Sequence, residues 1–450
     1  MSSFHTFSDK YNSMRRVKQA IESIVCIKPG EGGALLWSWL YIFSLFLAYY
    51  VLRPIREELG VAGGVKNLPW LFSGTLIAMT LINPLFSWVV KNWPREKFIA
   101  ISYRFFMLNI ALFILLLSLA TSEQRVWIGR AFFIWVSVFN LFVISVFWSF
   151  VVDIFSAEQA KRLFAFLASG ATVGGIVGSS LTSGLVEIIG QSWLLVVSII
   201  LLEFAVFAAR RLSSISDSFK LPIEQKEAHQ PLNGTLFAGI IHTFRSPDLL
   251  GIAFFILCYA VTSTILYFQQ ATIATQNFPD SASRTAFFAS INLWINGITL
   301  VIQLFLTGRI IAWIGIAFTL CAMPLLSIVG FSGLAAFPGI GIFIIFQVTR
   351  SVSNYALTRP AREVLFTAVT REDRYKTKNF IDTVVYRTGD QVAAWSYAGL
   401  LAVGLSLTGI AVIAIPLSVA WLFLGLWLGL RQEKWQRQSN QLDLGEASKD

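Results

Sequence analysis

Apolar runs of about twenty residues recur along this 450-residue chain and constrain its fold more than any other feature. As a helix, each run is long enough to cross a hydrocarbon core of about 30 Å. Hydrophobic residues make up 56% of the chain and charged residues only 13%, whereas soluble domains carry about 25% charged residues. The runs are continuous and do not alternate with polar residues, which excludes a membrane β-barrel. The sequence therefore predicts an all-α polytopic membrane protein.

The runs predict twelve spans in two groups of six. The spans are expected at 34–58, 69–90, 98–120, 126–152, 163–187, 191–209, 249–269, 285–306, 312–332, 340–366, 379–403 and 410–430. The longest polar interruption lies between the sixth and seventh spans. The expected domains are a cytoplasmic segment, a six-helix half, a cytoplasmic linker, a second six-helix half and a cytoplasmic tail, at 1–33, 34–209, 210–248, 249–430 and 431–450. By analogy, this organisation resembles the major facilitator fold, in which substrate binds between the two halves.

The distribution of basic residues predicts the orientation of the spans. If the N-terminus is cytoplasmic, 24 of the 35 Lys and Arg residues fall in cytoplasmic segments, as the positive-inside rule requires. The net charge of +10 then belongs to loops, and no nucleic-acid partner is expected. The first apolar run, 34–52, lacks a small-residue cleavage site and is predicted to be a true span. We expect a monomer in a bacterial inner membrane, with both termini cytoplasmic, whose partners are the lipid bilayer and a small-molecule solute.

Seven arginines lie inside the predicted spans. A charged side chain at the centre of a membrane costs about 2.5–3.5 kcal/mol, so seven unpaired arginines would cost roughly 20 kcal/mol, more than a typical stability of about 5–15 kcal/mol. Each guanidinium must therefore reach the interface, pair with an acid or line water. The seven are Arg53, Arg56, Arg104, Arg350, Arg359, Arg362 and Arg387.

Four of these arginines belong to a repeated motif, Arg-Pro-x-Arg-Glu. It occurs in "YYVLRPIREEL" (49–59) and again in "NYALTRPAREVLF" (354–366). The proline in each copy, Pro54 or Pro360, removes a backbone donor and favours a bend in the helix. The repeat therefore predicts two bent helices, each with a charged face.

The first arginine and the glutamate of each motif are four residues apart and lie on one helical face. We hypothesise that Arg53 and Glu57 contribute to an outer gate, and Arg359 and Glu363 to an inner gate. The alternative is that these side chains simply extend to the membrane surface at the helix ends. The two interpretations differ in whether neutralising Arg53 or Arg359 would impair transport.

A second polar stripe runs along the span 379–403. Its members recur every three to four residues within apolar sequence, which is typical of one hydrated helical face. Arg387 and Asp390 can pair with each other or contact substrate, and both interpretations stay open. The stripe consists of Asn379, Asp382, Thr383, Tyr386, Arg387 and Asp390.

Acidic residues precede a basic turn after the fourth span and again after the tenth. In the first half, Asp153 and Glu158 come before Lys161 and Arg162, and "REVLFTAVTREDRYKTKNF" has a similar pattern in the second half. We interpret these turns as structural hinges at the cytoplasmic rim.

Glycines at positions 170, 174 and 178 predict a close approach of two helices. Helix packing is favoured over phosphate binding there, because no strand precedes the glycines and no Lys-Ser/Thr follows them. The chain has no Walker A pattern, no His/Cys cluster and no Gly-x-Ser-x-Gly elbow. We therefore expect a transporter that is not an enzyme and has no cofactor or metal.

Three segments resemble the ATP/ADP translocases of plastids and intracellular bacteria, which are nucleotide exchangers related to the major facilitator fold. They are "YYVLRPIREEL", "FWSFVVDIFSAEQAKRLF" and "NYALTRPAREVLFTAVTREDRYKTKNFIDTVVYRTGD". The residues that match this family by position are Arg56, Glu57, Asp153, Glu158, Lys161, Arg162, Arg362, Glu363, Lys376, Lys378, Asp382 and Arg387.

The chain also departs from that family. Arginine replaces lysine in the first and tenth spans, and Arg359 stands where the family tends to have an acid. The seventh span offers Gln269 and Gln270 where the family has an acidic residue. The scaffold can therefore be retained while the cargo differs, although an arginine fork still suits a phosphate.

We interpret the chain as a secondary transporter for an anionic or phosphorylated, nucleotide-like solute. The expected substrate-binding residues are Arg56, Arg362, Arg387, Asp382, Tyr386 and Asp390. The expected gating residues are Arg53, Glu57, Arg359, Glu363, Asp153, Glu158, Lys161, Arg162, Lys376 and Lys378. The alternatives are a transporter or flippase for an amphipathic cargo, such as a lipid or siderophore, and a non-transporting scaffold or receptor.

Overall fold

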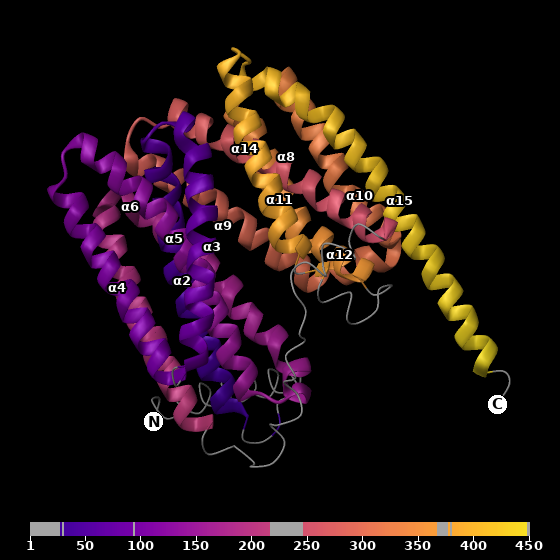
Figure 1. Cartoon of the computed structure of the whole chain (residues 1–450), viewed down its shortest axis with the longest axis horizontal. Coiled ribbons are helices and arrows are strands. Elements are labelled where there is room, and N and C mark those ends of the chain that lie inside the picture. The colour runs from indigo at the N-terminus through magenta and orange to yellow at the C-terminus, as the bar shows by residue number, and fades with distance from the viewer. Residues whose placement is uncertain are drawn as a thin grey trace, which may run out of the picture. The chain divides into compact units, whose positions relative to one another are not determined.

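Helices account for all the regular secondary structure in the part of the chain that the structure describes (Figure 1). The computed structural model describes residues 28, 31–92, 95–216, 246–366, 377–378 and 380–447. The α-helices are α2 (Gly32–Ala62), α3 (Leu68–Asn92), α4 (Arg95–Leu119), α5 (Ser122–Ile154), α6 (Ala157–Ser216), α8 (Pro247–Asn277), α9 (Ser281–Phe305), α10 (Thr307–Ala336), α11 (Ile340–Ser353), α12 (Arg359–Leu365), α14 (Tyr386–Ala402) and α15 (Leu407–Ala447). Short helices are the 3₁₀-helix η1 (Val65–Asn67) and the π-helices η2 (Asn354–Thr358) and η4 (Ile381–Val385).

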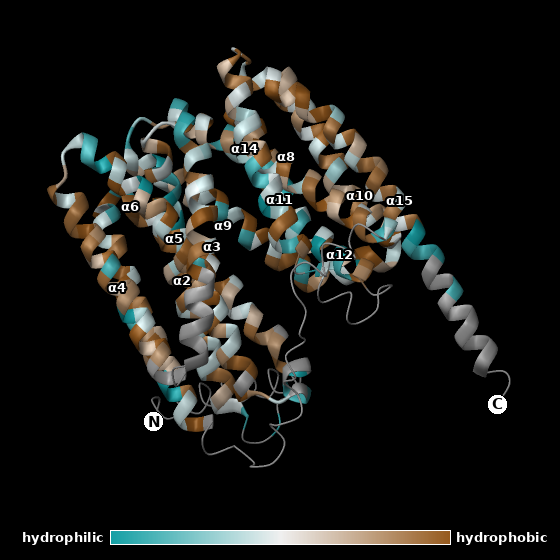
Figure 2. Ribbon diagram, in the orientation of Figure 1, coloured by the Kyte–Doolittle hydropathy of each residue, from teal (hydrophilic) through white to brown (hydrophobic). Residues whose placement is uncertain are grey.

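The prediction of an all-α membrane protein is confirmed, but the count of twelve spans is not exact. Ten helical segments in the described ranges are long and apolar enough to cross a membrane. One of them, Arg162–Ile215, has 54 residues and contains two of the predicted spans. The stretch predicted as the eleventh span begins with a π-helix, which leaves α14 with only 17 residues. Figure 2 shows apolar residues along most of the helices and hydrophilic residues around α12.

Two glycines interrupt long helices. Gly190 in α6 and Gly315 in α10 have φ values of 77° and 79°, which side chains other than glycine rarely adopt. The break at Gly190 confirms the predicted boundary between 187 and 191. The break at Gly315 lies inside the predicted span 312–332, so that span's expected start is wrong by a few residues. Residues 307–314 are already helical, so a short helical segment precedes the break at Gly315.

The chain divides into two compact units. The first contains Met1–Ile55, Thr80–Ile128 and Trp135–Glu227, and the second contains Arg56–Met79, Gly129–Ile134 and Ala228–Asp450. The second unit therefore contains the C-terminal helices together with the end of α2, the first part of α3 and a short piece of α5. One division, between residues 227 and 228, falls within the linker 210–248, and the others arise because these N-terminal pieces pack against α8, α9 and α14.

In the first unit, the predicted glycine contact joins α6 to α2. Side chains added at Gly170, Gly174 and Gly178 would meet α2 atoms at 2.9, 2.5 and 2.7 Å. Two of these nearest atoms are backbone carbonyl oxygens, of Phe43 and Leu47. Only glycine permits this approach, since a β-carbon would overlap the facing helix.

We expect Gly174→Ala to destabilise the protein by about 3 kcal/mol, the upper end of the usual range for overpacking. The added methyl would lie 2.5 Å from the Phe43 carbonyl oxygen, which cannot move without shifting α2. Gly184→Ala is the matched control on the same helix, because nothing lies within 4 Å of its β-carbon position. Thermal unfolding in detergent measures both. Equal melting temperatures for the two variants would contradict this packing.

In the second unit, α15 packs along α10, and α14 packs against α8. Both contacts depend on glycine. A β-carbon at Gly429 of α15 would lie 2.2 Å from the Cα of Ala317, and one at Gly389 of α14 would lie 2.6 Å from the Ala260 β-carbon. The close contact of α14 with α8 holds the polar stripe of α14 beside the polar residues of α8.

Candidate functional site

The charged motif at the end of α2 forms an ion pair within itself. Arg56 donates a hydrogen bond to Glu57 at 2.6 Å. The same guanidinium donates to the backbone oxygen of Phe133 at 3.2 Å and lies 3.8 Å from the centre of that ring. Glu57 also accepts a hydrogen bond from the Tyr267 hydroxyl of α8. Arg56 and Glu57, which were predicted to have different roles, thus form one cluster with α5 and α8.

A second ion pair at this end was not predicted as functional. Arg284 of α9 donates to Glu58 at 2.9 Å, and the Glu58 side chain is only 1% exposed. Arg284 is also held by the backbone oxygens of Phe278 and Pro279, at 3.0 and 2.8 Å. The sequence shows the second glutamate of "REEL", but nothing near it in the chain indicates that it pairs with an arginine 226 residues away.

Polar and aromatic contacts connect α3 to α14 near the same end. The Ser73 hydroxyl donates to the Gln391 side-chain oxygen at 2.8 Å and accepts from the Trp395 indole at 3.2 Å. Trp70 and Trp395 meet edge to face, with ring centroids 4.8 Å apart. Together with the two glutamates, these contacts join α2 and α3 to α8, α9 and α14 within the second unit. We call this set the α2–α3 cluster.

The second copy of the motif occupies a distorted helix. The π-helix η2 runs directly into α12, which contains Pro360. The oxygen of Ala356, four residues before this proline, accepts a hydrogen bond from the Thr307 hydroxyl at 2.8 Å in place of the missing N–H group. The bend predicted near this proline is therefore accommodated by a wide helical turn. In the first copy, by contrast, α2 is a single helix through Pro54.

The two arginines of this second copy differ in their partners. Arg362 pairs with Asp382 at 3.2 Å and with Glu363 at 3.5 Å, and Lys378 donates to Glu363. Arg359 has no hydrogen bond or ion pair within the described ranges, and its side chain is exposed. Its guanidinium lies 4.8 Å from the centre of the Tyr355 ring.

The polar stripe on η4 and α14 contacts three other helices: α8 through Asp390, α12 through Asp382 and α3 through Arg387. Asp390 is buried, accepts a hydrogen bond from Thr264 at 2.9 Å and lies 3.5 Å from Arg387. Arg387 also lies 3.4 Å from the sulfur of Met79. The Tyr386 ring faces Tyr259 of α8, with centroids 6.0 Å apart. Asn379 lies outside the described residues.

A buried arginine, Arg350 of α11, was counted among the intramembrane charges but given no role. It is 4% exposed and donates to three hydroxyl groups, those of Ser327, Ser263 and Thr262, at 3.0, 3.0 and 2.7 Å. The sequence shows only that this arginine lies inside a span. Its three hydrogen-bond partners belong to two other helices, α8 and α10, and could not be identified from the sequence.

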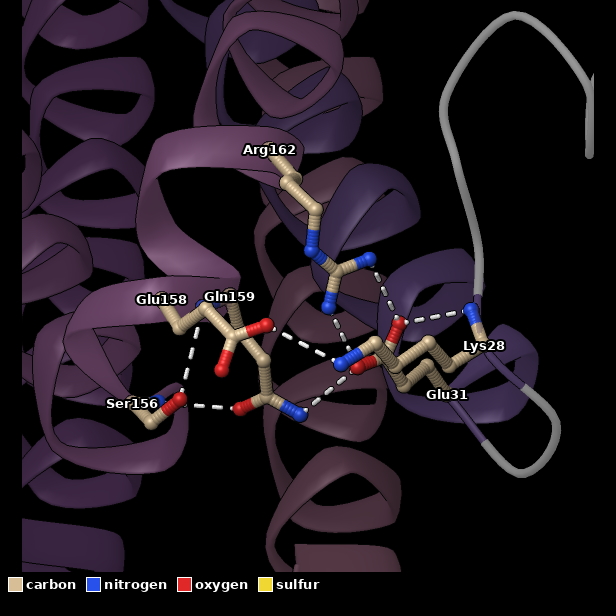
Figure 3. A network of polar contacts seen from close by, with 6 residues as sticks. All are labelled: Lys28, Glu31, Ser156, Glu158, Gln159 and Arg162. Carbon is tan, nitrogen blue, oxygen red and sulfur yellow. Dashed lines mark hydrogen bonds and ion pairs between the residues drawn. The ribbon is translucent and has the colours of Figure 1, made fainter.

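The predicted gating residues of the first unit form a separate network, shown in Figure 3. Arg162 donates two hydrogen bonds to Glu31, at 2.9 and 3.3 Å, and Lys28 donates to Glu158 at 2.9 Å. Gln159 donates to Glu31 as well, at 2.9 Å. These contacts join the segment at the start of α2 to the start of α6.

Four predicted gating residues remain: Arg53, Asp153, Lys161 and Lys376. The Arg53 guanidinium lies 5.6 Å from the centre of the Tyr50 ring, one turn before it on α2. The side chains of Asp153 and Lys161, and the whole of Lys376, lie outside the described residues. The structure therefore brings the predicted residues together in three groups rather than one.

The network in Figure 3 should give the protein an acid-sensitive element. Burial alone raises the pKa of Glu31, but the hydrogen bonds from Arg162, the Lys28 amide and Gln159 together outweigh it and hold that pKa below its usual value. A carboxylate with a lowered pKa stabilises the fold above its unfolded pKa, and this stabilisation is lost as the pH falls through the folded pKa. We therefore expect Glu31→Gln to destabilise the protein at neutral pH, and we expect its stability difference from the parent to shrink as the pH falls through the folded pKa of Glu31.

Melting temperatures measured in detergent from about pH 8 to about pH 3 test this expectation. Glu123→Gln, which replaces an exposed acid at the start of α5, is the control and should show no such convergence with the parent protein. A Glu31→Gln variant as stable as the parent at neutral pH would contradict the role of the network.

The family model for the Major Facilitator Superfamily matches residues 34–378. ADP,ATP carrier protein 1 from Chlamydia muridarum is 24% identical over 338 residues, and the carrier of the same name from Chlamydia trachomatis is 23% identical over 338 residues. Each alignment covers 66% of this chain, and the chain spans 64% of the length of these relatives. The resemblance to ATP/ADP translocases is thus confirmed at the level of sequence similarity.

Solved transporter structures share the fold. A bacterial homologue of the iron transporter ferroportin in an inward-facing state has a TM-score of 0.63 and 10% identity, and covers 90% of this chain and 98% of its own. A bacterial homologue of the lysosomal transporter Spinster, also inward-facing, has a TM-score of 0.58 and 15% identity, with 90% and 99% covered. The nucleoside transporter NupG has a TM-score of 0.57 and 12% identity, with 90% and 100% covered. With its apolar helices and the family match over 34–378, the chain is a multi-pass membrane transporter that belongs to the Major Facilitator Superfamily.

Proposed function

We propose that this chain is a secondary transporter that works by alternating access and carries an anionic, phosphorylated small molecule. The observation that carries the proposal is the Arg359 guanidinium, which lies inside a span, is exposed and has no hydrogen bond or ion pair in the described part of the chain. A cation without a direct hydrogen bond or ion pair is costly at such a position, and an anionic solute that binds there offsets this cost. Arg362, three residues further on, adds a second guanidinium on the same helical side.

A nucleotide-like cargo is supported by the similarity to carriers that are named for ADP and ATP. Aromatic rings beside the guanidinium groups also support it, since Tyr355, Tyr259 and Tyr386 lie in the same region. The cationic residues Arg362 and Arg387 are already paired with Asp382 and Asp390. We therefore assign the first contact with the anion to Arg359 and place these paired arginines around it.

We assign the α2–α3 cluster to an outer gate in its closed state. The assignment is supported by contacts that join α2 and α3 to helices of the C-terminal half, including the Glu58–Arg284 pair and the Ser73–Gln391 hydrogen bond. The inner gate would involve the acidic and basic residues around α12 and the start of α6. In this proposal the halves are 34–209 and 249–430, joined by the linker 210–248, and both termini are cytoplasmic in a bacterial inner membrane.

The test is uptake into proteoliposomes that contain the purified protein, with a panel of labelled nucleotides, sugar phosphates and lysophospholipids. We expect uptake or exchange of at least one phosphorylated anion and none in protein-free vesicles. No transport of any anion would reject the proposal. Movement of the lysophospholipid alone would favour an amphipathic cargo instead.

A further inference from the structure

The buried Arg350 is satisfied in hydrogen bonding but not in charge. Its Nε, Nη1 and Nη2 atoms donate to Ser327 of α10 and to Ser263 and Thr262 of α8. These acceptors are neutral hydroxyl groups. Thr262 and Ser327 in turn donate to carbonyl oxygens of their own helices, at 2.8 and 2.9 Å. The network thus ties α11 to two neighbouring helices without supplying a negative charge.

Among the described residues, no carboxylate pairs with Arg350. The titratable groups that bear on its charge are the two tyrosines Tyr259 and Tyr386. The guanidinium lies 5.6 Å from the centre of the Tyr259 ring, whose hydroxyl accepts a hydrogen bond from Asn354 at 2.8 Å. A full positive charge therefore remains inside the second unit, although an unpaired buried charge is strongly unfavourable.

The location of this charge connects it to the proposed solute site. Tyr259, which lies beside the Arg350 guanidinium, also faces Tyr386 of the polar stripe, and Tyr355, one residue after the hydrogen-bonded Asn354, lies beside Arg359. Arg359 follows Arg350 by nine residues, which is about 13 Å along a helix. Because Arg350 is buried and each of its three nitrogens already donates to a hydroxyl group, it acts on a solute at Arg359 through its charge, in a medium of low dielectric constant, rather than through a hydrogen bond.

We propose that Arg350 is a specificity-determining residue whose buried, uncompensated positive charge favours more highly charged anions at the neighbouring Arg359 without touching them. The inference rests on the proposed function. A purely structural alternative would hold that the arginine serves only to link three helices through their hydroxyl groups. The two roles predict different results, because only the first depends on the charge of the solute.

The first experiment compares Arg350→Gln with Arg350→Lys in proteoliposomes. Competition by ATP, ADP, AMP and uncharged adenosine gives an apparent affinity for each step in charge. At about 13 Å and an effective dielectric constant near 20, one unit of solute charge changes affinity by about three- to tenfold. We expect Arg350→Gln to weaken binding by this factor for each added negative charge and to leave adenosine unchanged. Arg350→Lys should keep the preference, since it keeps the charge.

A second pair of variants leaves the arginine in place. Ser327→Asp puts a carboxylate next to the guanidinium, and Ser327→Asn is its uncharged match. We expect the aspartate variant alone to lose the charge preference. This pair decides the question even if Arg350→Gln does not fold.

Several outcomes would overturn the inference. They are an equal loss of affinity for all four competitors in Arg350→Gln, a lysine variant that behaves like the glutamine variant, and an aspartate variant that behaves like the asparagine variant. Failure of the parent protein to transport any anion would instead reject the proposed function, so the two failures are distinguishable.

Discussion

Arg359→Gln should reduce the transport efficiency for the anionic solute by about 30-fold or more. Losing one member of a desolvated charge pair costs about 2–5 kcal/mol, and each 1.4 kcal/mol is a factor of ten. The effect is expected to be large because Arg359 has no ion pair or hydrogen bond in the described ranges that would limit its contact with solute. Initial rates in proteoliposomes over a range of solute concentrations measure it.

Two further variants make this result specific. Arg359→Lys keeps the charge but loses the planar fork, so it should retain part of the activity. Arg309→Gln removes an exposed arginine from the start of α10 and should leave transport unchanged. If Arg359→Gln transports as well as Arg309→Gln, then Arg359 does not contact the solute, and the proposed site is wrong.

The second large effect is expected at the Glu58–Arg284 pair. Replacing Arg284 with alanine leaves a carboxylate that is 1% exposed without its arginine, and removal of one partner of a buried pair costs about 3–5 kcal/mol. In a transporter with two states, we expect this cost to fall on the state that contains the pair. The α2–α3 cluster should therefore separate in a large fraction of the molecules.

Chemical cross-linking can measure this shift. In a cysteine-free background, Ser73→Cys combined with Gln391→Cys provides a pair at residues that are hydrogen-bonded here at 2.8 Å. We expect a short cross-linker to join them efficiently in the parent and poorly in Arg284→Ala. The exchanged pair Glu58→Arg with Arg284→Glu should restore the yield. Lys66→Ala, which removes an exposed cation from the 3₁₀-helix η1 between α2 and α3, is the control.

Equal cross-linking yields in the parent and Arg284→Ala would show that the pair does not hold this end closed. A loss of yield that the exchanged pair fails to restore would mean that local packing matters more than the ion pair. Either result would remove the Glu58–Arg284 pair from the proposed gate.

Much of the fold was predictable because membrane helices depend on local composition. The apolar runs predicted α2, α3, α4, α5, α8 and α9 to within about eight residues at each end. The glycines spaced by four in α6 predicted a close helix contact, which the structure has with α2. The less accurate predictions lie where the backbone departs from a simple α-helix, at Gly315 and at the π-helices η2 and η4. The sequence marked the region of η2 only as a bend near Pro360, and it gave no signal for η4 or for the break at Gly315.

The candidate site was predictable only in part. The sequence correctly singled out the arginines of the two repeated motifs as unusual, because charge inside a membrane is costly wherever it points. It did not distinguish Arg359, which has no hydrogen bond or ion pair among the described residues, from Arg362, which pairs with Asp382. It also gave Glu58 and Arg350 no role, since their partners lie far away in the chain.

The sequence by itself determined that the chain is helical and spans a membrane, because the transfer of about twenty apolar residues into lipid is a sum over one local segment. It also determined which charges need an explanation. Only the tertiary structure decided the partners of each charge. Glu58 and Arg284 pair with each other, Arg350 donates to neutral hydroxyl groups that leave its charge unbalanced, and Arg359 has no ion pair or hydrogen bond in the described ranges. The physical reason is that a partner is chosen by the packing of helices that can be hundreds of residues apart, such as the 226 residues between Glu58 and Arg284.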